Sequence, residues 1–111
     1  MNRDALMLGL AASVHPDTGY SAHRVSSKVV LTSKGRDVGV VLFGQSSDIP
    51  RCIVWHENRL VGECQFSGEN GWKIFPIIGG KKSVVPLLNV DPIHFLIEED
   101  SGTELPIAAA V

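Results

Sequence analysis

The chain has 111 residues, of which 44% are hydrophobic and 20% charged, and its formal net charge is −2. This length and composition predict one globular domain over residues 1–111 and exclude a disordered or fibrous chain. Residues 56–111 carry four Lys and Arg against eight Asp and Glu, whereas residues 1–55 carry six against four. An acidic half argues against nucleic acid as a partner.

The N-terminal segment MNRDALMLGLAASV (residues 1–14) is the best helix candidate. Asn2 or Asp4 can cap the helix, and Leu6 and Leu10 lie on one apolar stripe. The apolar run is too short to span a bilayer, and Asp4 offsets the positive charge of Arg3 that a signal peptide would need. We therefore expect a cytoplasmic protein that does not associate with membranes.

Residues 15–26 are expected to form a loop, because Pro16 ends the helix and the letters DTG that follow are typical of a turn. The loop is rich in side chains that acid–base chemistry uses: His15, Asp17, Tyr20, Ser21 and His23. An enzyme or ligand-binding barrel that uses residues 15–23 is therefore one hypothesis. Surface and turn-forming roles are the simpler interpretation, because catalytic groups usually come from distant parts of a chain. We expect binding residues in this loop but no catalytic residue.

From residue 27 onward the hydrophobic pattern is that of short strands. Turn sequences separate seven or eight apolar segments at intervals of eight to twelve residues: KVVLTS, DVGVVLFG, RCIVWH, RLVGECQF, WKIFPII, SVVPLL, IHFLIEE and, at the end, ELPIAAAV. This spacing predicts a mainly β fold, or α+β with one N-terminal helix. The antiparallel meander would occupy residues 27–111 and form a small barrel or a sandwich.

The segment CIVWHENRLVGEC (residues 52–64) is interpreted as a hairpin with a two-residue loop at EN. In a regular ladder His56 then lies opposite Arg59, and Cys52 and Cys64 point to opposite faces of the sheet. The two thiols could then neither form a disulfide nor share a metal ion. The spacings typical of zinc ligands are missing as well, so we expect no metal and no cofactor. His56 lies on the polar face and is a candidate binding residue.

The segment WKIFPIIGGKKSVVPLL (residues 72–88) is apolar on both faces of its strands. An antiparallel strand in a monomer usually has one wet face, so this pattern indicates cover on both sides. Two prolines also limit pairing to further strands, which suggests a two-stranded ribbon standing partly clear of the sheet. We expect a homodimer or another closed homo-oligomer, with an interface that includes Trp72, Ile74, Phe75, Ile77, Val85 and Leu87.

No catalytic pattern in the sequence rises above background. The hypothesis favoured is a small non-enzymatic binding module that recognises another protein, as adaptor, immunity and inhibitor proteins do. The rival hypothesis is a small-molecule-binding barrel or an enzyme built around residues 15–23, with Trp55 or Trp72 lining a pocket. Binding of single-stranded nucleic acid on an aromatic barrel face is disfavoured by the charge.

Overall fold

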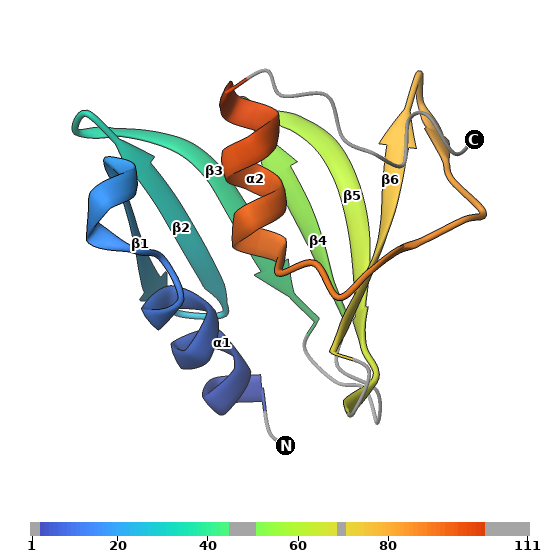
Figure 1. The fold of residues 1–111 in the computed structure, drawn as a ribbon, viewed down its shortest axis with the longest axis horizontal. Coiled ribbons are helices and arrows are strands. Elements are labelled where there is room, and N and C mark those ends of the chain that lie inside the picture. The colour runs from blue at the N-terminus through green and yellow to red at the C-terminus, as the bar shows by residue number, and fades with distance from the viewer. Residues whose placement is uncertain (1–2, 45–50, 69–70, 102–111) are drawn as a thin grey trace.

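The computed structural model describes residues 3–44, 51–68 and 71–101. Among them, two α-helices lie on the same face of an antiparallel sheet of eight strands (Figure 1). The helices are α1 (Arg3–Ala12) and α2 (Pro92–Ser101). The strands are β1 (Tyr20–Val25), β2 (Lys28–Ser33), β3 (Arg36–Phe43), β4 (Arg51–His56), β5 (Arg59–Phe66), β6 (Trp72–Ile78), β7 (Lys81–Lys82) and β8 (Leu87–Leu88).

The sheet is a simple meander in which strands β1 to β7 pair in chain order, and β8 also pairs with β6. The mainly β class, with seven to eight antiparallel strands and an N-terminal helix, is confirmed. Over the described residues the sheet remains open, because β1 and β7 are edge strands that do not pair with each other. The described strands therefore do not close into a barrel. None of the helices in the described part of the chain is long and apolar enough to cross a bilayer.

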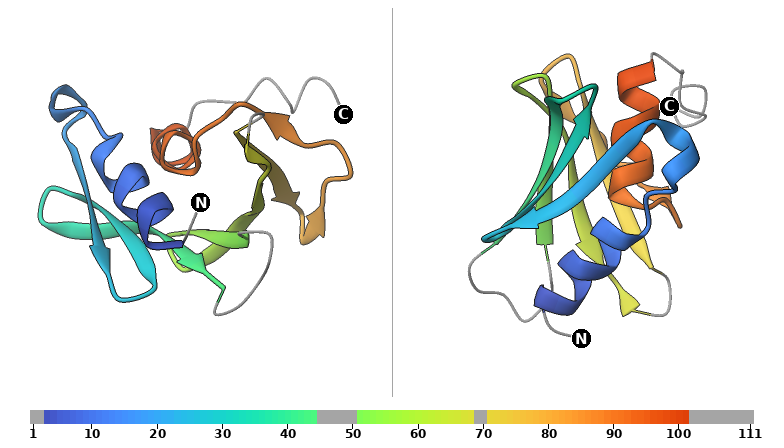
Figure 2. Two further views of the ribbon diagram at one scale, coloured as in Figure 1. Left: turned by 90° about the horizontal axis from the view of Figure 1, so that it is seen from below. Right: turned by 90° about the vertical axis from the view of Figure 1, so that its left-hand side faces the viewer.

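The core lies between the sheet and the two helices, on what we call the inner face of the sheet (Figure 2). Helix α1 contributes Leu6, Met7 and Leu10, and α2 contributes Ile93, Phe95 and Leu96. These side chains pack on inward-facing residues of the strands, among them Val29, Leu31, Val41, Val54, Cys64 and Ile74. The opposite side of the sheet, which neither helix covers, is called the outer face.

The segment predicted as the strand IHFLIEE is helix α2. Its start is specified locally: Pro92 takes the first helical position, and the Asp91 side chain accepts a hydrogen bond from the backbone N–H of Ile93 at 2.8 Å. The apolar positions suit a helix better than a strand, because Phe95 and Leu96 are both buried while His94 is exposed. The strand prediction is therefore wrong, and the fold has a second helix.

The loop predicted over residues 15–26 is only partly a loop. Residues Pro16–Thr18 form a short 3-10 turn, which Gly19 ends with a left-handed conformation (φ 82°). The rest forms β1, which pairs with β2 from Tyr20 opposite Ser33 to Val25 opposite Lys28. The sequence does not predict this strand, because it is an exposed edge strand and lacks the sustained alternation of apolar residues that indicates a strand. The predicted final strand ELPIAAAV lies outside the described residues.

The β4–β5 hairpin has the predicted two-residue turn. Glu57 and Asn58 both have positive φ angles, 50° and 64°, as a tight hairpin turn requires. His56 lies opposite Arg59, as expected. The ladder then shifts by one residue, because Val61 is accommodated as a β-bulge between the pairs on either side of it.

This bulge reverses the predicted orientation of the cysteines. Cys52 lies directly opposite Cys64, and both are free thiols buried on the inner face. The prediction that Cys52 occupies a polar face apart from Cys64 is therefore wrong. Burial raises the pKa of the Cys52 thiol well above its usual value, and a hydrogen bond with Cys64 adds to the effect. The Cys52 thiol is accordingly held in its neutral, unreactive form.

Candidate functional site

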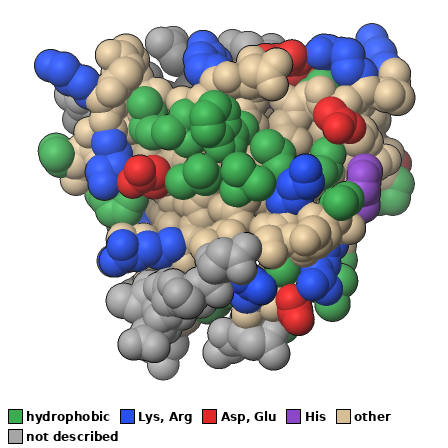
Figure 3. Space-filling model, turned by 180° about the vertical axis from the view of Figure 1, so that it is seen from behind, with side chains coloured by type: hydrophobic (Ala, Val, Ile, Leu, Met, Phe, Trp, Pro, Cys, Tyr) green, Lys and Arg blue, Asp and Glu red, His purple; other side chains and the backbone are tan. Residues whose placement is uncertain are grey.

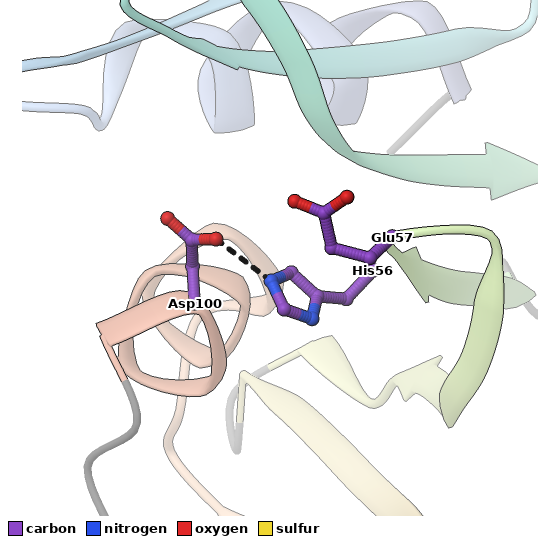
Figure 4. Close-up of side chains that lie close together, drawn as sticks. All are labelled: His56, Glu57 and Asp100. Atoms are coloured by element: carbon purple, nitrogen blue, oxygen red, sulfur yellow. Dashed lines mark hydrogen bonds and ion pairs between the residues drawn. The ribbon is translucent and has the colours of Figure 1, made fainter.

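A polar cluster joins three elements at one end of the inner face. The His56 side chain from β4 meets Asp100 in the last turn of α2, with 2.8 Å between Nε2 and Oδ1 (Figure 4). The second carboxylate oxygen of Asp100 accepts a hydrogen bond of 2.9 Å from the hydroxyl of Tyr20 at the start of β1. The cluster therefore ties the end of α2 to strands that are distant in the sequence.

The electrostatics of the cluster follow from the position of Asp100. A carboxylate in the last turn of a helix faces the negative end of the helix dipole, so it needs donors. The hydrogen bond from His56 lowers the pKa of Asp100, an effect that burial opposes and the bond from Tyr20 supports. The same bond to Asp100 raises the pKa of Tyr20. Because the carboxylate is the acceptor, the Nε2 atom of His56 carries the proton.

The cluster is poorly arranged for acid–base catalysis. A general base needs a ring nitrogen that substrate can reach. The Nε2 atom of His56 is occupied by Asp100, and its Nδ1 atom is buried with no hydrogen-bond partner among the described residues. The hydrogen bonds of the cluster join α2 to β1 and β4.

The same corner offers a set of three potential metal ligands. One ligand atom each from His56, Glu57 and Asp100 lies within 4.8 Å of the others. However, Arg36 already forms an ion pair of 3.0 Å with the Glu57 carboxylate. Arg36 thus pairs with the Glu57 carboxylate, and hydrogen bonds from His56 and Tyr20 engage that of Asp100, so a divalent ion would have to displace these partners.

Asp100→Asn tests the role of the carboxylate. Its folded-state pKa is lowered, so its ionised form stabilises the fold above the unfolded pKa of about 4, and this contribution is lost as pH falls through the folded-state pKa. We expect the substitution to lower the free energy of unfolding by about 1 kcal/mol at neutral pH. The difference from wild type should vanish in acid. Urea titrations between neutral and acidic pH would measure it.

A matched control for this prediction is Asp17→Asn. The Asp17 side chain is 91% exposed, so its replacement should change stability little at any pH. An acid dependence that is unchanged in Asp100→Asn would show that the carboxylate has no stabilising partners in the fold.

The structure places the predicted loop residues in different surroundings. His15 and Asp17 form an exposed pair 3.5 Å apart, and His23 is exposed on β1. Of the candidates on different strands, Tyr20 and His56 come together, through Asp100. Sequence reasoning missed Asp100, which is 80 residues from Tyr20 and lies in the segment mistaken for a strand.

A larger candidate site is the outer face of the sheet. Figure 3 shows a band of apolar side chains across the middle of this face, with charged side chains at its margins. The strand registers assign the apolar band to eight residues that are mostly half-buried: Val30, Val40, Leu42, Ile53, Trp55, Leu60, Phe75 and Ile77. A contiguous apolar surface that is left uncovered on one face of a sheet is a candidate interaction site.

Two shallow hollows flank the centre of the apolar band. One, of about 350 Å³, is lined by residues that include Val30, Trp55 and Lys28. The other, of about 390 Å³, is lined by residues that include Ile53 and Glu63. Leu42 lines both hollows. The outer face is therefore a ridge between two depressions, each with charged groups at its rim.

The residues predicted as an oligomer interface divide between the two faces. Trp72 and Ile74 belong to the core, and Leu87 packs against it. Phe75 and Ile77 alternate with them on the outer face, while Val85 is 44% exposed beyond β7. The ribbon predicted to stand partly clear of the sheet joins it along most of β6, which pairs with β5 from Trp72 to Pro76.

Comparison of the chain with family models, with curated proteins and with solved structures gives no match.

Proposed function

We propose that this protein is a small non-enzymatic binding module that recognises a protein partner through the outer face of its sheet. The observation that supports this proposal is the apolar band on the side of the sheet that α1 and α2 leave uncovered. Its composition resembles the centre of a protein interface, with Trp55 and Phe75 among aliphatic side chains and the charges at the margin. We also propose a cytoplasmic location, where reducing conditions keep Cys52 and Cys64 as thiols.

The rival function, an enzyme or ligand-binding barrel built around residues 15–23, has less support. His15 and Asp17 are exposed and contact each other. Tyr20 is engaged by Asp100. The two outer hollows are open to solvent, whereas small-molecule sites usually enclose most of their ligand. The geometry thus favours a broad partner such as another folded chain.

Ile53→Lys tests the proposed function. Ile53 lies at the centre of the outer face, half-buried, so a lysine there can reach solvent without entering the core. A protein that co-purifies with the wild type should be identified, produced separately and titrated against each variant. We expect the substitution to weaken binding by tenfold or more, because it places a charge in the apolar centre.

The matched control is Leu8→Lys on α1, where the wild-type side chain is already 57% exposed on the opposite side of the molecule. It should bind like the wild type. Equal loss of binding in both variants, or turnover of a small molecule that depends on His15 or His23, would contradict the proposal.

A further inference from the structure

We propose that a second copy of this chain covers the outer face, in a dimer with a two-fold axis. This inference rests on the proposed function only in using the same face of the sheet. It identifies the molecule bound there as a second copy of the chain. The reason lies in the order of outward-facing side chains across the strands. When a second copy presents the same order reversed, each side chain lies opposite one that complements it. A two-fold interface requires this property, because each side must complement a copy of itself.

The first row of side chains crosses the sheet at the level of Lys28. Continuous strand registers place Lys28 on β2 opposite Leu42 on β3, then Ile53 on β4 and Glu63 on β5. The order is thus cation, apolar, apolar, anion. Directly paired residues share a face of the sheet, so all four project outward together.

A two-fold axis that lies in the interface, runs along the strands and passes between β3 and β4 reverses this order in the second copy. Lys28 then meets the partner's Glu63, and Leu42 meets the partner's Ile53. Symmetry makes each contact twice. Lys28 has no ion-pair partner within the described part of its own chain, so the contact supplies one. A row with like charges at both ends would repel its copy in the same arrangement.

The neighbouring row behaves the same way under the same axis. The registers align Val30 on β2 with Val40 on β3, Trp55 on β4 and Leu60 on β5. Reversal pairs Val30 with the partner's Leu60 and Val40 with the partner's Trp55. All of these contacts are apolar, so no unpaired charge is buried.

The size of the face predicts how strong the dimer is. Five strands at about 4.8 Å spacing, and about five residues along each, give a surface of about 24 Å by 15 Å. This is about 360 Å² per protomer, below the roughly 600 Å² per partner of the smallest standard interfaces, so the dimer is weak. Glu63 also already has an intrachain ion pair with Lys82 at 3.0 Å, so the partner's Lys28 adds a second cation to that carboxylate rather than a first. We therefore expect a dimer that dissociates on dilution through the micromolar range.

Charge-reversal variants, compared by sedimentation equilibrium, test the proposed arrangement of the dimer. The wild type should show a concentration-dependent monomer–dimer equilibrium. Lys28→Glu and Glu63→Lys should each raise the dissociation constant by about tenfold or more, because each creates like-charge contacts at both ends of the interface. The double variant restores opposite signs with the positions exchanged, so its dissociation constant should return to within a few-fold of wild type.

The control is Lys81→Glu, which makes the same change in net charge at an exposed residue beyond the two rows. It should dimerise like the wild type. Circular dichroism would establish that every variant is folded. A wild type that stays monomeric at high micromolar concentration would overturn the inference, as would a double variant no better than the single ones. If that monomer still binds a different protein that Ile53→Lys releases, only the second-copy occupant is wrong and the proposed function stands.

Discussion

Replacing Phe95 with alanine should lower the free energy of unfolding by about 3–5 kcal/mol. Phe95 is 1% exposed, at the centre of the contact between α2 and the inner face. One of its ring carbons would lie 3.5 Å from a Cβ atom built on Gly62, so the ring lies directly against the β5 backbone. The surrounding strands are tied in a continuous ladder and can collapse little into the space that the ring leaves. Chemical unfolding followed by circular dichroism would measure the change.

His94→Ala is the control for this prediction, because it removes a neighbouring side chain of the same helix that is exposed to solvent. The substitution should change stability by about 0.5 kcal/mol or less. Similar costs for the two substitutions would mean that α2 does not pack on the sheet through Phe95.

The elements that the sequence predicted are those with a local signal. The two-residue turn at Glu57-Asn58 and the N-terminal helix were predicted from residue types alone, and both are present. The β5 bulge at Val61 has no such signal: a regular ladder separated apolar from polar residues more cleanly than the observed one. Packing with distant residues favours the bulge, because it brings Cys64 into the core and leaves Glu63 in solvent contact on the outer face.

Helix α2 shows a different limit of sequence reasoning. Its apolar residues Ile93, Phe95 and Ile97 alternate as they would in a strand, yet Asp91 and Pro92 form a helix-start signal just before them. A short apolar run fits both periods, and the helix start should have decided between them. Because the segment was interpreted as a strand, Asp100 could not be connected with the two candidates that it joins.

The outer face was anticipated only in part. The sequence showed that residues 72–88 are apolar on both sides, and Phe75 and Ile77 do lie on the outer face. The same feature in β3 and β4 extends the band to Leu42 and Ile53, which the prediction did not include. The two helices cover only one face of the eight-stranded sheet. Strands that are apolar on both faces therefore leave one apolar face uncovered.

Replacing Gly39 with valine should lower the free energy of unfolding by about 2–3 kcal/mol, through overpacking rather than a cavity. A Cβ atom at Gly39 would lie 2.9 Å from a methyl carbon of Leu96 and 3.2 Å from the backbone oxygen of Trp55. The leucine methyl can rotate away, whereas the carbonyl belongs to the β4 strand and cannot. The glycine therefore sets how closely α2 approaches β3, and thermal or urea unfolding would report its loss.

Three further variants separate this mechanism from a general effect of removing glycine. Gly9 lies in α1 with no atom within 4 Å of an added Cβ carbon, so Gly9→Ala should stabilise the protein by about 0.5–1 kcal/mol through helix propensity.

Leu96→Ala alone should lower the free energy of unfolding by about 2–5 kcal/mol, because Leu96 is fully buried. In the double variant, valine at position 39 fills part of the space that Leu96 leaves. The loss of unfolding free energy in the double variant should therefore be smaller than the sum of the two single losses by about 1 kcal/mol or more. If the two single costs in unfolding free energy simply add in the double variant, the side chain of Leu96 is not the reason that position 39 requires glycine.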